Sequence, residues 1–340
     1  MYSQNNLKNT HLKIWMITLL IMITVIILVG GLTRLTDSGL SITTWELFSG
    51  ILPPLTNDKW MDYFNLYKTI PEYNEQNFNM TLNEFKIIFW WEWVHRQLGR
   101  LVGLAVLLPM SFFSIKYGFK ILKKYGIIFL LVCFQGLIGW YMVSSGLVNK
   151  IDVSHYRLSL HLVTAFIILS LVFWKLLQLS KLNINEISIK LFPIRFFLFL
   201  LFLQLIIGAF VSGMDAGKVY NTWPLMGSSY FPNDSKYIEI FNFNVFDNPS
   251  LVQFIHRNLA YIIIIFYLYL LFSVIREKHG ILNMPIIIIG ISLLLQIFLG
   301  VLTVLSGVKI FYASLHQINS IIIILSTLYF LYIAQYKKIT

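Results

Sequence analysis

The chain carries little charge and almost no cysteine. Only 12% of its 340 residues are charged, whereas 57% are hydrophobic, a balance that excludes a soluble globular protein of this length. The one cysteine, Cys133, lies inside an apolar run, so the sequence excludes an intrachain disulfide and a cysteine-ligated metal or iron–sulfur centre. What remains is an integral membrane protein.

The N-terminus also lacks the marks of a removable targeting segment. Its first apolar run, at about residues 14–33, is long enough to span a membrane and has no small-residue cleavage site after it. The segment is not rich in Arg and Ser, as a transit peptide would be. We therefore expect a retained first helix, and a bacterial rather than a mitochondrial membrane.

Apolar runs of membrane-spanning length recur along the whole chain. They fall at about residues 14–33, 94–115, 126–146, 158–179, 191–212, 252–274, 284–305 and 314–335. The sequence therefore predicts an all-α integral membrane protein with eight transmembrane helices. Two connections on the outer side are long, at about residues 34–93 and 213–251.

Charge separates the two sides of the predicted membrane. The N-terminal tail, the even-numbered connections and the C-terminal tail hold 14 of the 26 Lys and Arg residues but 2 of the 15 acids, a net charge of +12. The other side holds the remaining 12 cations and 13 acids, a net charge of −1. The positive-inside rule then places both termini in the cytoplasm of a cell (inner) membrane. The net charge of +11 follows from this topology, and we expect no nucleic-acid partner.

The two halves of the chain resemble one another. An offset of 178 residues aligns Gly30, Asp37, Gly39, Thr44 and Trp45 with Gly208, Asp215, Gly217, Thr222 and Trp223. An offset of 161 aligns His95, Arg96, Gln135, Gly139 and Gly146 with His256, Arg257, Gln296, Gly300 and Gly307. Each half has four spans, an even number, so the repeat is parallel rather than inverted. We predict two pseudo-symmetric four-helix bundles, residues 1–182 and 183–340.

Four histidines occupy matched positions in the repeat. His95 pairs with His161 and His256 with His316, each at the start of the second or fourth span of its half, near the outer face. These helices can face each other across a bundle, so that a flat macrocycle sits between two imidazoles. Interfacial histidines bonded to loops are the alternative, but packing alone does not demand four matched imidazoles. The sequence thus predicts two haem sites.

Arginines follow two of the histidines directly. Arg96 and Arg257 could pair with haem propionates, or could snorkel to lipid phosphate, and the sequence does not decide between these roles. His155, in an outer loop, has no partner in the repeat and receives no role.

The repeat breaks at one ionisable position. Glu92 precedes His95 by three residues, on the same helix face, and its partner at +161 is Gln253. A carboxylate beside a cofactor can move a proton or stabilise a cation. The alternative is an ion pair with Arg96 at i,i+4. We favour the chemical role, which makes the first half the reaction site and the second half a structural or electron-transferring haem site.

At this point the residues resemble a known family, the haem A synthases. The likeness covers essentially the whole chain. It rests on the segments GGLTRLTDSGLSITTWELFSGILPP, FWWEWVHRQLGRLVG, SLHL, DAGKVYNTWPLMG, FIHRNLAY and SLHQINS. Because the outer loops carry no cysteine pair, the chain resembles the cysteine-free subgroup of proteobacteria and mitochondria, and thiol-based electron delivery is excluded.

The resemblance implies a division of labour between the halves. Haem b would be held by His256 and His316, while the substrate, haem O, would lie near His95 and His161 with Glu92 important for catalysis. The family reaction oxidises a porphyrin methyl group to a formyl group through hydroxylated intermediates. Haem O synthase and the assembly of cytochrome c oxidase are the partners implied; the electron donor is unknown, and a homo-oligomer is compatible with the sequence.

Two other classes remain as alternatives. A two-haem cytochrome b-type subunit that oxidises quinol would also need four histidines, with Glu92 as a proton acceptor. A transporter is the third class, since internal repeats are common there.

Overall fold

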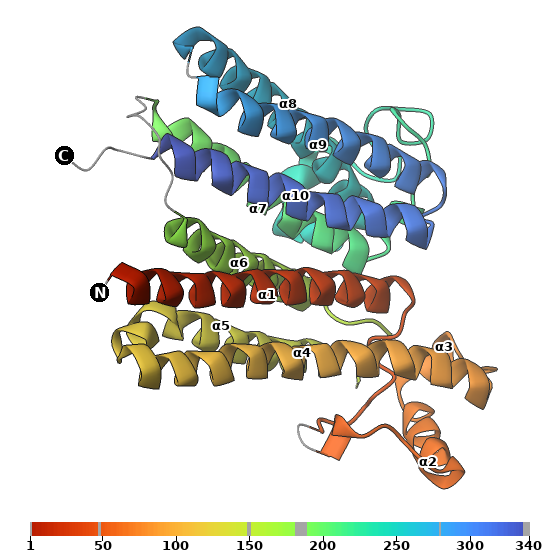
Figure 1. Cartoon of the computed structure of the whole chain (residues 1–340). Coiled ribbons are helices and arrows are strands. Elements are labelled where there is room, and N and C mark those ends of the chain that lie inside the picture. The colour runs from red at the N-terminus through yellow and green to blue at the C-terminus, as the bar shows by residue number, and fades with distance from the viewer. Residues whose placement is uncertain (1, 47–48, 148–150, 181–188, 279, 336–340) are drawn as a thin grey trace. The chain divides into compact units, whose positions relative to one another are not determined.

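The computed structural model describes residues 2–46, 49–147, 151–180, 189–278 and 280–335, and over these ranges it is helical, with no strands. Its elements in chain order are α1 (Tyr2–Leu35), η1 (Ser49–Ile51), α2 (Asn57–Tyr67), α3 (Pro71–Glu75), α4 (Leu82–Tyr117), α5 (Lys120–Val143), α6 (His155–Leu179), α7 (Leu191–Gly213), η2 (Ala216–Lys218), η3 (Tyr237–Phe241), η4 (Phe243–Asp247), α8 (Pro249–Glu277), α9 (Gly280–Leu305) and α10 (Ile310–Ala334) (Figure 1).

The predicted spans are confirmed as helices. Within the described residues, eight helices are long and apolar enough to cross a membrane: α1 and α4 to α10. From α5 to α10, the observed bounds lie within a few residues of the predicted runs. The chain is thus a multi-pass membrane protein of the all-α class.

Helix α4 begins earlier than predicted. The sequence placed its start at about residue 94, at the end of a long loop, but the helix begins at Leu82. A capping box starts it there: the Thr81 hydroxyl accepts from the Glu84 amide, and the Glu84 carboxylate accepts from the Thr81 amide at 2.8 Å. Consequently His95 lies several turns inside α4 rather than at its start. With 36 residues, α4 is about 54 Å long at 1.5 Å per residue, more than a hydrocarbon layer of about 30 Å.

The chain forms two compact units. One comprises residues 18–168, and the other comprises residues 1–17 and 169–340. The boundary that we predicted between residues 182 and 183 lies outside the described residues. Each histidine pair falls within a single unit.

In the 18–168 unit, the folded segment between α1 and α4 covers the first turns of α4. We call residues 36–46 and 49–81 the outer segment, after the side of the membrane on which we expect them. Helices α2 and α3 lie beside the N-terminal end of α4 (Figure 1), and α2 packs on it. The aromatic core there includes Phe64 and Tyr67 of α2 and Phe85 and Phe89 of α4, all buried. Burying each such side chain contributes roughly 1.5–3 kcal/mol. This packing explains why α4 continues outward past its most apolar stretch.

In the other unit, four helices form a closed bundle. Helix α7 packs against α8, α8 against α9, α9 against α10, and α10 against α7. Helices α8 and α10 therefore face one another diagonally across the bundle, as the sequence predicted for the second and fourth helices of a half. The segment η4 packs against α8, and η2 packs against α7, α8 and α9.

Candidate functional site

The first histidine pair comes together inside the 18–168 unit. His95 on α4 and His161 on α6 have ring centroids 6.4 Å apart, with ring planes at 67°. Both histidines lie within the helical bundle and are half-buried. The Nδ1 atom of each ring has no hydrogen-bond partner among the described residues. The described residues therefore engage neither ring through Nδ1.

The second pair has nearly the same geometry. His256 on α8 and His316 on α10 have centroids 6.5 Å apart and planes at 64°, and both rings are half-buried. Two imidazoles that bind one metal ion from opposite sides, each about 2 Å from it, have centroids roughly 6 Å apart. Both pairs therefore have a ring spacing that would suit one iron ion between two imidazoles.

A glycine on a neighbouring helix makes room for each of the four rings. A Cβ atom at Gly30 would lie 2.7 Å from Cε1 of His95. The equivalent distances are 3.2 Å from Gly139 to His161, 3.2 Å from Gly208 to His256 and 3.0 Å from Gly300 to His316. Any side chain would push the ring out of place, so the close approach requires glycine. These glycines match one another in the sequence repeat.

Glu92 lies at the centre of a buried hydrogen-bond cluster. Its Oε1 accepts from Nε and Nη2 of Arg96 at 3.0 and 2.6 Å. Its Oε2 accepts from the Ser41 hydroxyl at 2.7 Å and from the Ile42 amide at 2.8 Å. The ion pair with Arg96, which the sequence offered as the alternative, is thus present. The chemical role of Glu92 stays a prediction, and in this arrangement the carboxylate also holds the outer segment against α4.

Both sequence-predicted arginines hold outer loops. Arg96 also donates to the carbonyls of Thr44 and Ile42, at 3.1 and 2.8 Å. Arg257 donates to the carbonyls of Leu225 and Tyr220, at 3.3 and 3.2 Å. Because Ile42 and Tyr220 correspond in the repeat, the two arginines perform the same structural task in each half. Contact with a propionate stays a prediction for both.

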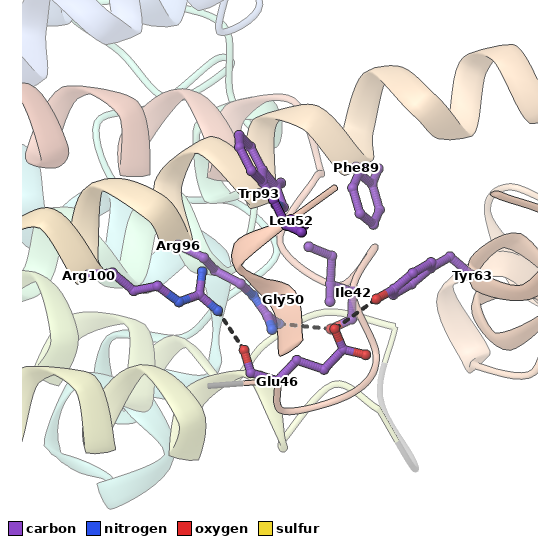
Figure 2. Close-up of a pocket in the computed structure, with 9 residues that line it drawn as sticks. All are labelled: Ile42, Glu46, Gly50, Leu52, Tyr63, Phe89, Trp93, Arg96 and Arg100. Atoms are coloured by element: carbon purple, nitrogen blue, oxygen red, sulfur yellow. Dashed lines mark hydrogen bonds between the residues drawn. The ribbon is translucent and has the colours of Figure 1, made fainter. Parts of the chain in front are cut away.

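A small cavity lies beyond Glu92, between the outer segment and α4. Figure 2 shows Glu46 at its edge, where its carboxylate accepts from the Tyr63 hydroxyl at 2.7 Å and its carbonyl accepts from Arg100 at 2.5 Å. Its volume is about 10 Å³, which is room for about one water molecule. It is far too small for a macrocycle and contains none of the four histidines, so it is not the haem site. Burial, and then the bond to Glu46, raise the pKa of Tyr63 to about 12.

Comparison with known proteins shows the family of this chain. A family profile described as cytochrome oxidase assembly protein matches residues 13–328. A heme A synthase of Pelagibacter ubique is 48% identical over 97% of this chain and 98% of its own length. One of Rickettsia bellii is 43% identical over 92% and 95%, and one of Agrobacterium fabrum 41% over 92% and 87%. This chain belongs to the haem A synthase family. The resemblance seen in the motifs is thereby confirmed.

In this member of the haem A synthase family, sequence reasoning missed the glutamines beside the histidines. Gln204, one turn before Gly208, lies with its Nε2 3.2 Å from Nδ1 of His256. Gln296, one turn before Gly300, has its Nε2 3.3 Å from Nε2 of His316. The pattern QxxxG was visible in the sequence, but only the tertiary contacts give the amides a task.

A buried acid in the outer segment was also missed. Glu72 on α3 is 3% exposed, and its carboxyl accepts from the Tyr67 hydroxyl at 3.0 Å. Burial raises the pKa of Glu72 to about 8, while the bond from Tyr67 opposes this shift. Burial also raises the pKa of Tyr67, to which Asn77 donates at 2.8 Å. His155, which received no role, is the first residue of α6 and lies against Tyr156.

Proposed function

We propose that the protein is a haem A synthase, an oxidoreductase that converts a methyl group of haem O to the formyl group of haem A through hydroxylated intermediates. One observation carries the proposal. Two histidine pairs, spaced at 6.4 and 6.5 Å, have the same glycine-backed geometry, but only one has a carboxylate in the next turn. The names of the relatives support this reading.

The two halves would then divide the work. His95 and His161 would hold the substrate, haem O, and His256 and His316 would be the axial ligands of haem b. Haem iron supplies the one-electron and oxygen chemistry of the reaction. The chain would supply the imidazoles that hold the two haems. We keep the predicted division into residues 1–182 and 183–340 as part of this proposal.

Glu92 would act at the first site. Its carboxylate fixes Arg96, the Ser41 hydroxyl and the Ile42 amide beside the helix that carries His95. A fixed negative charge here can stabilise a cation that forms during oxidation, or take up a proton if one of its hydrogen bonds opens. Arg96 and Arg257 would meet propionates, since they lie next to the ligand histidines and carry charge at the same end of each site.

The proposed setting is a cell (inner) membrane with both termini in the cytoplasm. The charge difference between the two sets of loops supports this orientation. The haem sites would then lie near the outer face. Haem O synthase would deliver the substrate, and haem A would pass to the assembly of cytochrome c oxidase.

Pigment analysis tests the function directly. The protein is produced together with a source of haem O, purified, and its haems are extracted and identified by mass spectrometry. We expect haem b together with haem O, hydroxylated haem or haem A. Haem b as the sole pigment would overturn the proposal and leave the two-haem electron carrier.

A further inference from the structure

The helix that faces each histidine carries a repeated pattern with one exception. Gln135 precedes Gly139 by four residues, Gln204 precedes Gly208, and Gln296 precedes Gly300. Residues four apart lie on the same helix face. At the fourth position, one turn before Gly30, the residue is Ile26. His95 is therefore the one histidine of the four without a glutamine beside its glycine.

In the second half, the glutamines reach the imidazole rings. The Nε2 atom of Gln204 lies 3.2 Å from Nδ1 and 3.3 Å from Nε2 of His256, and 3.0 Å from the His256 carbonyl oxygen. At His316, Nε2 of Gln296 lies 3.3 Å from the ring, and Nδ1 lies 3.1 Å from the Gln296 carbonyl oxygen. Asn319 fixes the amide of Gln296 by donating to its Oε1 at 2.7 Å. Gln204 thus contacts the His256 ring close to both of its nitrogens, and the backbone carbonyl of Gln296 holds Nδ1 of His316.

In the first half, neither Nδ1 atom has such a partner among the described residues. Gln135 donates to the backbone carbonyl of His161, at 2.9 Å, rather than to the ring. Ile26 lies against α4 one turn beyond His95, where its Cδ1 would be 3.8 Å from a Cβ at Gly99. An apolar side chain there can pack against the helix but cannot orient an imidazole.

The chemistry of a ligated imidazole gives the amide its function. When Nε2 binds a metal, Nδ1 carries the proton and needs an acceptor that fixes the ring. The Oε1 atom of Gln204 is buried and has no hydrogen-bond partner among the described residues. Gln204 fixes the imidazole by contact instead, because its Nε2 donates to the His256 carbonyl at 3.0 Å and lies within 3.3 Å of both ring nitrogens.

We propose that Gln204 is a positioning residue that fixes His256 so that the second-half haem is retained. In the same proposal, isoleucine at position 26 leaves His95 as the most loosely held ligand, through which the first-half haem exchanges. The inference rests on the proposed function, since a substrate must enter and its product must leave, whereas a cofactor stays. A preorganised ligand binds more tightly because less freedom is lost on binding.

Reciprocal substitutions test the proposal. Gln204→Ile gives the second half the residue of the first, and Ile26→Gln does the opposite. Removing a hydrogen-bond partner of a metal-bound histidine typically weakens binding about 10–100-fold. We expect haem b to dissociate from Gln204→Ile into apomyoglobin at least tenfold faster than from the unaltered protein, and its low-spin spectrum to weaken. In Ile26→Gln, release of the first-half haem slows by a similar factor.

Gln178→Ile is the matched control, because it makes the same substitution at an exposed glutamine on α6. Its haem release should equal that of the unaltered protein. Unchanged release of haem b from Gln204→Ile, with Ile26→Gln also unchanged, overturns the inference while the proposed function stands. An unaltered protein that carries no haem dependent on His256 overturns the proposed function itself. If Gln204→Ile does not fold, Ile26→Gln decides alone through first-half release.

Discussion

Replacing Glu92 by Gln separates the proposed chemistry from the structural task of this carboxylate. The substitution removes the charge and retains the size. The amide oxygen can still accept from Ser41 and Ile42, but the amide nitrogen faces the guanidinium of Arg96, donor against donor. Two charge-assisted bonds, at 3.0 and 2.6 Å, are therefore lost.

The cost can be worked from these contacts. Removing one partner of a buried ion pair costs about 3–5 kcal/mol. We expect about 3 kcal/mol here, because Arg96 retains its hydrogen bonds to the carbonyls of Ile42 and Thr44. The other half shows that such a site can fold, because Gln253 stands four residues before Arg257 and donates to the Tyr220 carbonyl at 2.9 Å. A loss of about 3 kcal/mol raises the equilibrium constant for opening of the outer segment roughly a hundredfold.

Haem A formation, haem b content and hydrogen exchange at the Ile42 amide are measured on the same preparation of each variant. We expect Glu92→Gln to abolish haem A formation, to retain haem b, and to raise hydrogen exchange at the Ile42 amide roughly a hundredfold. Ser41→Ala removes a hydrogen bond that ties the segment to Glu92 and leaves the carboxylate and its ion pair, so it should raise the same hydrogen exchange but retain haem A formation. Full haem A formation by Glu92→Gln would refute the reasoning. Equal loss in both variants would make Glu92 a positioning residue only.

Three further outcomes are expected. His256→Ala and His316→Ala should each remove haem b, seen as loss of its absorbance in the purified protein; retention in both would show that the cofactor is held elsewhere. The pKa of Glu72 is raised in the folded state to about 8, so the folded outer segment binds the proton more tightly than the unfolded one and loses stability as the pH rises from about 4.5 to about 8. Glu72→Gln should flatten this dependence, measured by hydrogen exchange in α2 and α3, and an unchanged slope would contradict it. Alkaline phosphatase fused after Thr340 should be inactive and a fluorescent protein fused there bright, because the C-terminus is expected in the cytoplasm; the reverse would invert the topology.

Sequence reasoning succeeded where a feature depends on local composition. A run of about twenty apolar residues must be helical in a membrane, because no water is present to satisfy an open backbone. All eight spans were therefore predictable within the described residues. The pairing of His95 with His161 and of His256 with His316 was also predictable, because the repeat places each at the same point of its half.

Sequence reasoning failed where distant segments meet. The start of α4 was misplaced by twelve residues because the aromatic side chains of α2 cover its first turns. The partners of Glu92 at Ser41 and Ile42 lie about fifty residues away, in a segment whose path no periodicity reveals.

By itself, the sequence determined the class of protein, the number of its spans and the two matched histidine pairs, since hydropathy and repetition are properties of the chain. Only the tertiary structure decided how closely each ring approaches a glycine, which rings have a glutamine beside them, and that Glu92 holds the outer segment. Those facts depend on which side chains share a few ångströms of space. Helix packing sets that neighbourhood, and composition does not.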